Sequence, residues 1–404
     1  MRRAASLDTT PDARLLLTTR GVRAFVDGLV SVTLSSYLVL LGLSGTQVGT
    51  IVTGTLLGSA ALTLIAGFHG HRIPRRRLLS VVAAVMVATG VGFTVVTAFW
   101  LLLLVAVIGT LNPSAGDVSV FLPTEQALLP MTVSTHDRTA LYARYSLVGF
   151  TAAAFGSLAA GLPDVVARHG WLSERASQRT VFAVYGLAGL VVAVLYRRLS
   201  PSIEPSQDED RRALGPSRSI VYRLAAVFCV DAFGGGFAVQ SLIALWLYRR
   251  FDLSVATAGA IFFWAGLLSG GSALVAVRIA RRIGLVRTMV YTHIPANIFL
   301  MATALMPNLP LAITCLMARS ALAQMDVPTR TSYVMSVVTP AERSATASVT
   351  NVPRSLVAAF APLIAGRLLD HSTFGWPLVI GGALKLAYDV LLLAMFRKVP
   401  VRDD

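Results

Sequence analysis

The chain has 404 residues, of which 55% are hydrophobic and only 14% are charged, and its mean hydropathy is +0.69. A soluble protein carries about 25% charged residues, so this composition excludes an ordinary soluble domain and indicates that most side chains face lipid or each other. The formal net charge of +15 would suit a nucleic-acid-binding protein only if the basic residues formed one surface.

The basic residues instead alternate between successive loops. Of the 35 Lys and Arg residues, 25 lie in the two tails and in every second loop, whereas the intervening loops hold six. This is the positive-inside pattern, which predicts an even number of spans with both termini in the cytoplasm. We therefore expect a multi-pass protein of the cell inner (plasma) membrane, embedded in the lipid bilayer, with no nucleic-acid partner.

Apolar runs long enough to cross a bilayer follow one another along the chain. They predict an all-α integral membrane fold of about twelve transmembrane helices in two six-helix bundles. The expected order is a cytoplasmic tail (1–21), an N-terminal bundle (22–196), a polar cytoplasmic linker (197–219), a C-terminal bundle (220–396) and a cytoplasmic tail (397–404). The expected spans are 22–43, 46–69, 78–98, 99–122, 140–161, 179–196, 220–247, 254–277, 286–306, 309–336, 343–366 and 374–396.

Three of these spans contain residues that interrupt helices. Asn112-Pro113 is expected to bend the fourth span, and Pro328 is expected to kink the tenth. The seventh contains three consecutive glycines, 234–236, which favour either local unwinding or close helix packing.

The two halves resemble each other in sequence. With a shift of 205, 11 of the 44 positions from Phe121 to Asp164 are identical. With shifts of 204 to 210, the coinciding pairs include Asp27 and Asp231, Gly49 and Gly259, Pro123 and Pro328, Arg138 and Arg343, and Gly161 and Gly366. Parallel six-helix repeats with binding sites at their interface are a transporter architecture.

The loop between the second and third spans carries a more specific resemblance. It reads Gly-Phe-His-Gly-His-Arg-Ile-Pro-Arg-Arg and is similar to the Gly-x-Leu-Ala-Asp-Arg-x-Gly-Arg-Arg loop of the major facilitator superfamily. Gly67, Arg72, Arg75 and Arg76 match, and His71 replaces the aspartate. The resemblance implies a twelve-helix secondary transporter, of the drug-efflux type, in which this loop controls conformation. Because His71 stands in place of the aspartate, the conformational role of this loop would depend on the protonation of His71. The alternative is that the arginines of the loop serve only to set the membrane topology of the chain.

Ionisable residues inside spans are expected to face a cavity or a partner, because exposure to lipid is costly. Asp27 and Asp231 occupy equivalent places in the two halves, and we predict that they are proton-coupling residues. A buried carboxylate that gains and loses a proton near neutral pH suits this role. The alternative for Asp27 is a salt bridge to Arg23, one turn earlier on the same helix.

Arg319 and Arg354 lie near the middle of neighbouring spans and are candidates for substrate binding. Two guanidinium groups suit a carboxylate or a phosphate. The alternative is that Arg319 neutralises Asp231 or Asp27. Lys385 and Asp389, four residues apart in the last span, are expected to form a structural pair.

A second group of charges lies closer to the cytoplasmic mouth. Asp326 and Arg330 flank Pro328, and the repeat places Glu125 opposite Arg330. Opposite charges at equivalent positions predict a cytoplasmic gate that pairs across the two halves, formed by Asp117, Glu125, Asp326 and Arg330. The alternative is two separate local clusters.

Together these features predict a secondary active transporter that moves a small amphipathic compound in exchange for protons by alternating access, and the resemblance to the drug-efflux type implies that the direction is export. Exchange or uptake of an organic anion is the alternative, and a membrane sensor or scaffold that moves no solute is a third hypothesis. The chain shows no nucleotide-binding loop, no zinc spacing and no catalytic constellation. We therefore expect no enzymatic activity, no metal and no cofactor, and a monomer with a small-molecule substrate.

Overall fold

The computed structural model describes residues 10–69, 73–114, 120–133, 138–201, 215, 217–339 and 342–396, and all regular elements in these ranges are helical. The fold class is the expected all-α membrane fold. Asp117, His71 and Arg72 lie outside the described residues, as do residues 1–9, most of the linker and the C-terminal tail.

The N-terminal half begins earlier than the apolar pattern indicates. Its first helix starts at Pro11 instead of near residue 22, because Thr10 caps it: the Thr10 hydroxyl accepts a hydrogen bond from the Ala13 N–H at 3.3 Å. Proline at the first helical position adds to this start signal. The helices of this half are α1 (Pro11–Leu40), α2 (Gly45–His69), α3 (Arg75–Val95), α4 (Phe99–Ile108), α5 (Phe121–Leu128), α6 (Arg138–Ala159), α7 (Leu162–Arg168) and α8 (Glu174–Arg197), with a short 3₁₀ turn, η1 (Leu129–Met131), after α5.

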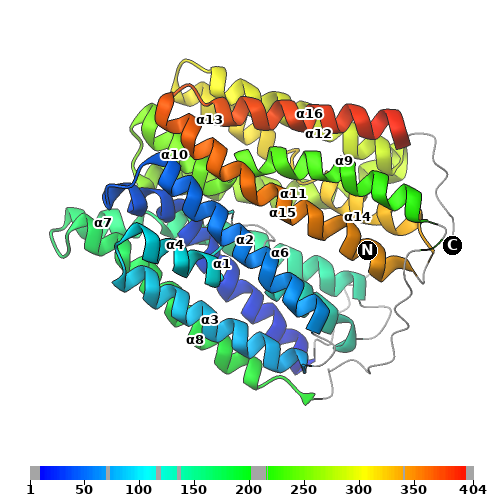
Figure 1. Ribbon diagram of the computed structural model, residues 1–404, viewed down its shortest axis with the longest axis horizontal. Helices are drawn as coiled ribbons and strands as arrows, with labels where there is room; N and C mark the ends of the chain where they lie inside the picture. Colours follow the sequence, from blue (N-terminus) through cyan, green and yellow to red (C-terminus); the bar gives the residue numbers. More distant parts are fainter. Residues whose placement is uncertain are drawn as a thin grey trace, which may run out of the picture.

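The C-terminal half forms the second bundle in Figure 1, and it differs from the first half in that its first span is divided into two helices. Its helices are α9 (Arg218–Phe237), α10 (Gln240–Phe251), α11 (Val255–Ile283), α12 (Leu285–Leu305), α13 (Leu309–Ser320), α14 (Asp326–Ser336), α15 (Arg343–His371) and α16 (Trp376–Phe396).

Three expected spans are interrupted helices. The fourth ends its first helix at Ile108 and passes through Asn112-Pro113, as predicted. The tenth is broken between Ser320 and Asp326, so Pro328 lies in the first turn of α14, where a proline is tolerated. The seventh breaks at residues 238–239, directly after the three glycines, which themselves remain helical.

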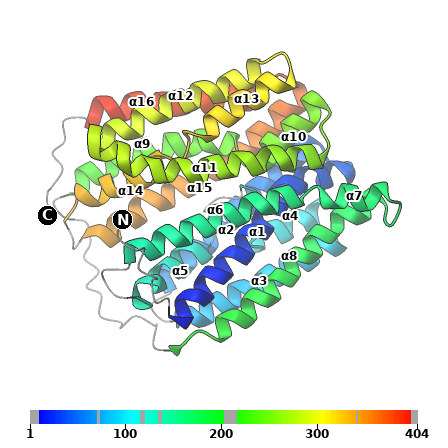
Figure 2. The same cartoon turned by 180° about the vertical axis from the view of Figure 1, so that it is seen from behind.

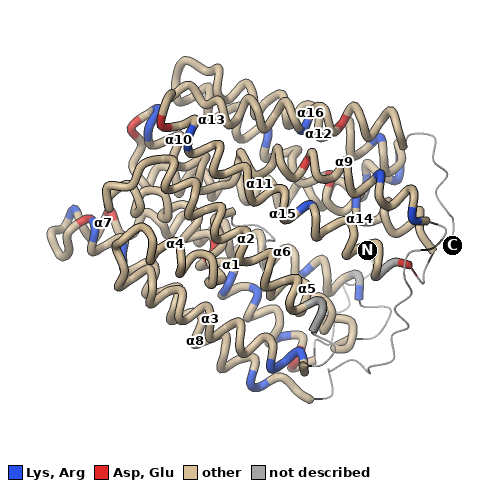
Figure 3. Tube along the Cα trace, in the orientation of Figure 1, with Lys and Arg blue, Asp and Glu red and all other residues tan. Residues whose placement is uncertain are grey.

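Nine helical segments within the described residues are long and apolar enough to cross a membrane, and two shorter apolar helices, α4 and α13, add to them. The chain is therefore a multi-spanning membrane protein. The count of twelve stays a prediction. Charged residues lie mainly at the two ends of the bundle (Figure 3).

The two halves meet at the end where α2 begins and α15 ends, which we call the far end; the terminal end is where α1 begins and α16 ends. Helix α2 crosses α15 on one side of the molecule, and α6 packs against α11 on the other (Figures 1 and 2). Glycines allow these approaches, because a Cβ on Gly366 would lie 2.1 Å from the Gly45 carbonyl oxygen, and one on Gly259 would lie 2.4 Å from that of Ser157. Gly259 and Gly366 are among the residues shared by the repeats, so the repeated glycines mark where the halves touch.

A carboxylate from each half caps a helix of the other half at the far end. The Asp370 carboxylate on α15 accepts hydrogen bonds from the backbone N–H groups of Gly45 and Thr46, each at 2.6 Å, at the start of α2. Asp164 on α7 accepts one from the Ala256 N–H at 3.1 Å, at the start of α11. A carboxylate at a helix N-terminus satisfies free N–H groups and interacts favourably with the helix dipole. These two caps therefore stabilise closure of the far end.

Candidate functional site

A buried acidic residue organises the interior of the N-terminal half. Glu125 on α5 is fully buried and forms a salt bridge with Arg23 on α1. The hydroxyls of Thr19 and Tyr196 donate to the same carboxylate at 2.7 and 2.6 Å, and that of Tyr145 donates as well. A buried ion pair is tolerated when further hydrogen bonds satisfy its remaining polar atoms. The three hydroxyls do this for the Glu125 carboxylate, whereas Arg23 Nε has no hydrogen-bond partner among the described residues. Thr19, Tyr145 and Tyr196 are uncharged and belong to no motif, so sequence analysis did not single them out.

Asp27 lies one turn beyond Arg23, close to the middle of α1, and only 8% of it is exposed. Its one hydrogen bond to another described side chain comes from Asn112 Nδ2 at 3.5 Å. The expected alternative, a salt bridge from Arg23, is not formed, because Arg23 is bonded to Glu125. Among the described residues, Asp27 therefore has no salt-bridge partner.

Interrupted backbone surrounds Asp27 and connects the halves. The Ser114 N–H donates to Asn112 Oδ1 at 3.1 Å, which holds the Asn-Pro turn of the fourth span. The Pro113 carbonyl accepts a hydrogen bond from the Ser241 N–H at 3.1 Å, where the seventh span resumes after its own break. Non-helical backbone at membrane depth is tolerated where it is buried in protein or lines a cavity. The breaks in the two halves thus meet beside Asp27.

Asp231 on α9 is the centre of a second cluster. Its carboxylate lies 2.6 Å from Lys385 Nζ, 3.2 Å from Arg330 Nη1 and 3.5 Å from Arg354 Nη2. Arg330 also bonds Asp326 at 3.1 Å. These cations come from α14, α15 and α16, so Asp231 joins four helices. The sequence identified Asp231, Arg330, Arg354 and Asp326 individually but not their convergence.

The prediction that Lys385 and Asp389 pair within the last span is wrong. Lys385 bonds Asp231 instead of Asp389, and Asp389 accepts hydrogen bonds from His293 at 2.9 Å and from Asn297 at 3.0 Å, both on α12. The His293 Nε2 atom lies 3.9 Å from Asp231, so this pair borders the Asp231 cluster. A lone histidine in an apolar span is a weak signal, and the sequence did not single out His293.

Arg319 lies in the last turn of α13, one residue before the helix ends at Ser320, and is half-buried. No described acidic side chain forms a salt bridge with it, so the expected alternative, neutralisation by Asp231 or Asp27, is not seen. An arginine without a counter-charge inside a membrane protein is costly unless a ligand or water accompanies it. Arg354 differs, because it already contacts Asp231.

The three gate residues that the structure describes, Glu125, Asp326 and Arg330, do not pair across the halves. Glu125 is bonded within the N-terminal half, and Arg330 and Asp326 are bonded within the C-terminal half, which is the arrangement of two separate clusters. A gate that pairs when the terminal end closes stays a prediction. From the loop motif, Gly67 lies in the last turn of α2, and Arg75 Nη1 donates to the Ala127 carbonyl at 3.1 Å, near the end of α5.

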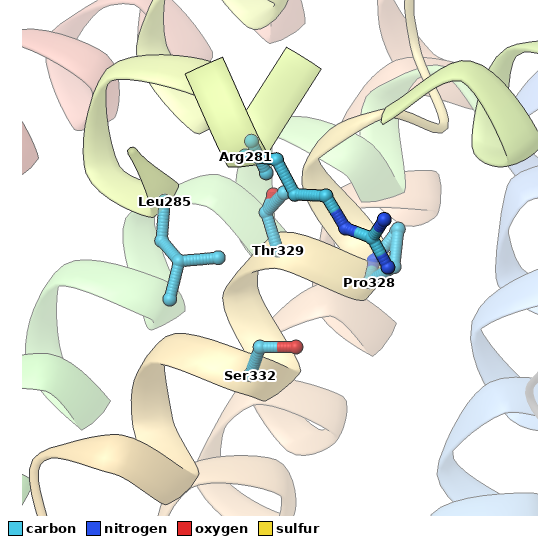
Figure 4. A pocket seen from close by; sticks show the side chains of 6 residues that line it. Arg281, Leu285, Pro328, Thr329 and Ser332 are labelled. Carbon is cyan, nitrogen blue, oxygen red and sulfur yellow. The ribbon is translucent and has the colours of Figure 1, made fainter. Parts of the chain in front are cut away.

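A separate pocket of about 200 Å³ opens at the terminal end, between the α11–α12 turn and α14 (Figure 4). The residues lining it are Ala280, Arg281, Leu285, Pro328, Thr329 and Ser332. None of the predicted site residues lines it, so the pocket is not the meeting place of the buried charges.

Comparison with known proteins decides the family. The sequence model of the Major Facilitator Superfamily matches residues 16–351. The chain belongs to the major facilitator superfamily. Solved transporters of similar fold include the nucleoside transporter NupG (TM-score 0.73, 13% identity, covering 96% of this chain and 100% of that one) and the E. coli xylose transporter XylE (TM-score 0.73, 15% identity, covering 97% and 99%).

Two relatives in sequence extend the comparison. The uncharacterized membrane protein YJR124C of Saccharomyces cerevisiae is 25% identical over 97% of this chain and 95% of its own. The multidrug efflux protein YfmO of Bacillus subtilis is 31% identical over 45% of this chain and 46% of its own. As a member of the major facilitator superfamily, the protein is a membrane transporter of small molecules and not an enzyme.

Proposed function

We propose that this transporter exports a small amphipathic compound in exchange for protons, and that Asp27 carries the proton. The observation that carries the proposal is the environment of Asp27, which is buried and has one amide hydrogen bond and no salt bridge to a described residue. Glu125, Asp231 and Asp326, by comparison, each have a basic partner. An ionised carboxylate without a counter-charge is expensive to bury, so a bound proton stabilises Asp27 in this environment.

The position of Asp27 supports a role in alternating access. It lies beside the point where the broken backbones of the fourth and seventh spans meet, and therefore between the two halves. The far end is closed by paired helix caps, and rocking of the halves would break these contacts and move the interface beside Asp27. Export is favoured by the similarity to a multidrug efflux protein, and the alternating basic loops favour cytoplasmic termini in the inner membrane.

The test is substrate-triggered proton movement in inside-out membrane vesicles. Ethidium and tetraphenylphosphonium serve as lipophilic cations, and benzoate and lactate as small organic anions. We expect a lipophilic cation to dissipate an imposed pH gradient with the wild type and not with Asp27→Asn. Glu174→Gln, an exposed carboxylate at the start of α8, is the matched control and should behave as the wild type. Equal proton movement in Asp27→Asn and wild type would refute Asp27 as the carrier.

A second candidate function is exchange or uptake of an organic anion, and Arg319 favours it. Its guanidinium is inside the bundle without a salt bridge to any described carboxylate, so it is available for a carboxylate or phosphate group of a substrate. Benzoate or lactate exchange that persists in Asp27→Asn and disappears in Arg319→Gln would support this function over proton-linked export.

A further inference from the structure

A buried carboxylate in the last span has no Lys or Arg partner among the residues that the structure describes. Asp389 on α16 is fully buried, and its two oxygens accept hydrogen bonds from His293 Nδ1 at 2.9 Å and from Asn297 Nδ2 at 3.0 Å. Lys385, one turn earlier, is bonded to Asp231 instead. Burying a carboxylate requires either a counter-charge or a proton, and His293 is the group in contact with Asp389 that can supply either.

The geometry around His293 accommodates the proton in two places. Nδ1 lies 2.9 Å from Asp389 and 3.2 Å from the amide nitrogen of Asn297. With the proton on Nδ1, the ring donates to the carboxylate; with the proton on Asp389, Nδ1 accepts from the acid or from the Asn297 amide. The contact between Nδ1 and Asp389 and the contact between Asn297 and Asp389 persist in both arrangements, while Nε2 faces Asp231 at 3.9 Å, beyond hydrogen-bond distance. The proton can therefore lie on either side chain without a change in packing.

Charged groups from several helices surround the pair. Asp231 on α9 lies 3.9 Å from His293 Nε2, and Tyr388 on α16 packs edge-to-face on the imidazole at 5.8 Å between ring centres. Lys385 on α16 and, from α14 and α15, Arg330 and Arg354 act through their contacts with Asp231, while Asp326 on α14 is paired with Arg330. Of the described residues on α11 and α13, none forms a salt bridge or hydrogen bond with His293.

We propose that His293 and Asp389 form a second proton-binding pair, in the C-terminal half, which holds one exchangeable proton and is coupled through Asp231 to Arg354. The pair is independent of Asp27, which lies in the other half. Its part in transport rests on the proposed function; its ability to bind a proton does not.

The coupling follows from the competition for Asp231. Of the three Arg and Lys contacts, that of Arg354 is the longest, at 3.5 Å, and its side chain is the most exposed, at 29%. A proton on His293 places a fourth positive charge beside the Asp231 carboxylate. This charge repels the Arg354 guanidinium and weakens the contact between Arg354 and Asp231. Protonation of the pair therefore releases Arg354 toward an anionic group, and loss of the proton returns Arg354 to Asp231.

The experiment is an infrared pH titration of the purified full-length protein in lipid, which follows the carboxylic-acid carbonyl band and the histidine ring bands without any substrate. Coupled groups titrate as a pair, so removing one partner should shift the titration midpoint of the other by about one pH unit or more. We expect Asp389→Asn to remove a carboxylic-acid band and to shift the His293 titration. His293→Gln should shift the Asp389 titration in turn.

Two further variants keep the test decisive. His371→Gln is the matched control, since this exposed histidine at the end of α15 bonds the Arg367 carbonyl and should leave the pair unchanged. Where Asp389→Asn does not fold, Asp389→Glu retains the acid and should move both titrations without abolishing them.

Identical His293 titrations in the wild type, Asp389→Asn and Asp389→Glu would overturn the proposal, as would the absence of any titration of the pair between about pH 5 and 9. The vesicle assay on Asp27→Asn is independent of these spectra. Failure of the proposed export therefore leaves the pair intact, and failure of the pair leaves the role of Asp27 standing.

Discussion

Gly366 is the residue whose substitution should most selectively open the far end. A Cβ placed on Gly366 would lie 2.1 Å from the Gly45 carbonyl oxygen and 3.0 Å from the Gly49 Cα, all of which is backbone that cannot rotate away. An ordinary contact of about 3.4 Å then requires α2 and α15 to separate by about 1.3 Å at this point. That separation also stretches the Asp370 cap on α2.

The free-energy cost of Gly366→Ala follows from the overpacking that the added methyl group causes. Adding one carbon to a tight contact costs about 1–3 kcal/mol. Because Gly366 contacts the other half, this cost falls on the state with a closed far end and not on the folding of either bundle. A difference of 1–3 kcal/mol corresponds to about a 5- to 150-fold change in the ratio of closed to open molecules.

Distances between spin labels measure this ratio directly. The native Cys229 and Cys315 are first replaced by alanine, and labels are attached at Glu174→Cys and His371→Cys, which are exposed at the far end of opposite halves. Gly366→Ala should move the distance distribution toward longer separations.

Gly271→Ala is the matched control, because Gly271 lies within α11 and a Cβ there meets nothing within 4 Å. A second label pair, at Arg198 and Ser219, reports the terminal end, which should close as the far end opens. An unchanged far-end distribution in Gly366→Ala, with the protein folded, would refute the conclusion that this glycine contact holds the halves together.

Three further predictions concern single side chains. Glu125→Gln leaves Arg23 buried without its counter-charge, so we expect the free energy of unfolding to fall by about 3–5 kcal/mol, measured by thermal denaturation in detergent. Arg319→Gln removes a guanidinium that has no salt bridge to a described residue, so the unfolding temperature should stay unchanged while any benzoate exchange falls about tenfold or more. Hydrogen bonds from Thr339 and Ser217 lower the pKa of Glu342, at the start of α15, from 4.5 to about 2. Because the folded pKa is the lower one, the stabilising effect of Glu342 is present above about pH 4.5 and is lost as the pH falls toward 2, so the difference in unfolding temperature between wild type and Glu342→Gln should shrink over that interval.

Each of these has a contrary outcome. An unfolding temperature of Glu125→Gln equal to the wild-type value would show that the Arg23 contact does not stabilise the fold. A strongly destabilised Arg319→Gln would indicate a structural role for that arginine. A difference for Glu342→Gln that stays constant with pH would show that its hydrogen bonds do not favour the ionised form.

The sequence alone was enough to predict the features that depend on composition, on the length of apolar runs and on the internal repeat. Apolar runs predict membrane spans because lipid admits only helices or closed barrels, and the repeat predicts two similar halves. The shared glycines of the repeat, such as Gly366, are the ones at which the halves touch. The break at Asn112-Pro113 was also predictable, since the backbone chemistry of proline is local.

The tertiary structure decided which charges are partners. Position along a span gives the depth of a side chain but not the helix that it faces. The spacing of four residues therefore predicts a Lys385–Asp389 pair and offers Arg23 only as an alternative partner of Asp27. The structure pairs Arg23 with Glu125, 102 residues away, and Lys385 with Asp231, 154 residues away. These pairings leave Asp27 without a salt bridge to any described residue and place His293 against Asp389, and they depend on helix packing that no local pattern records. The sequence by itself therefore determined the membrane architecture and the set of buried charges, and only helix packing decided which of those charges remain available to bind a proton or an anion.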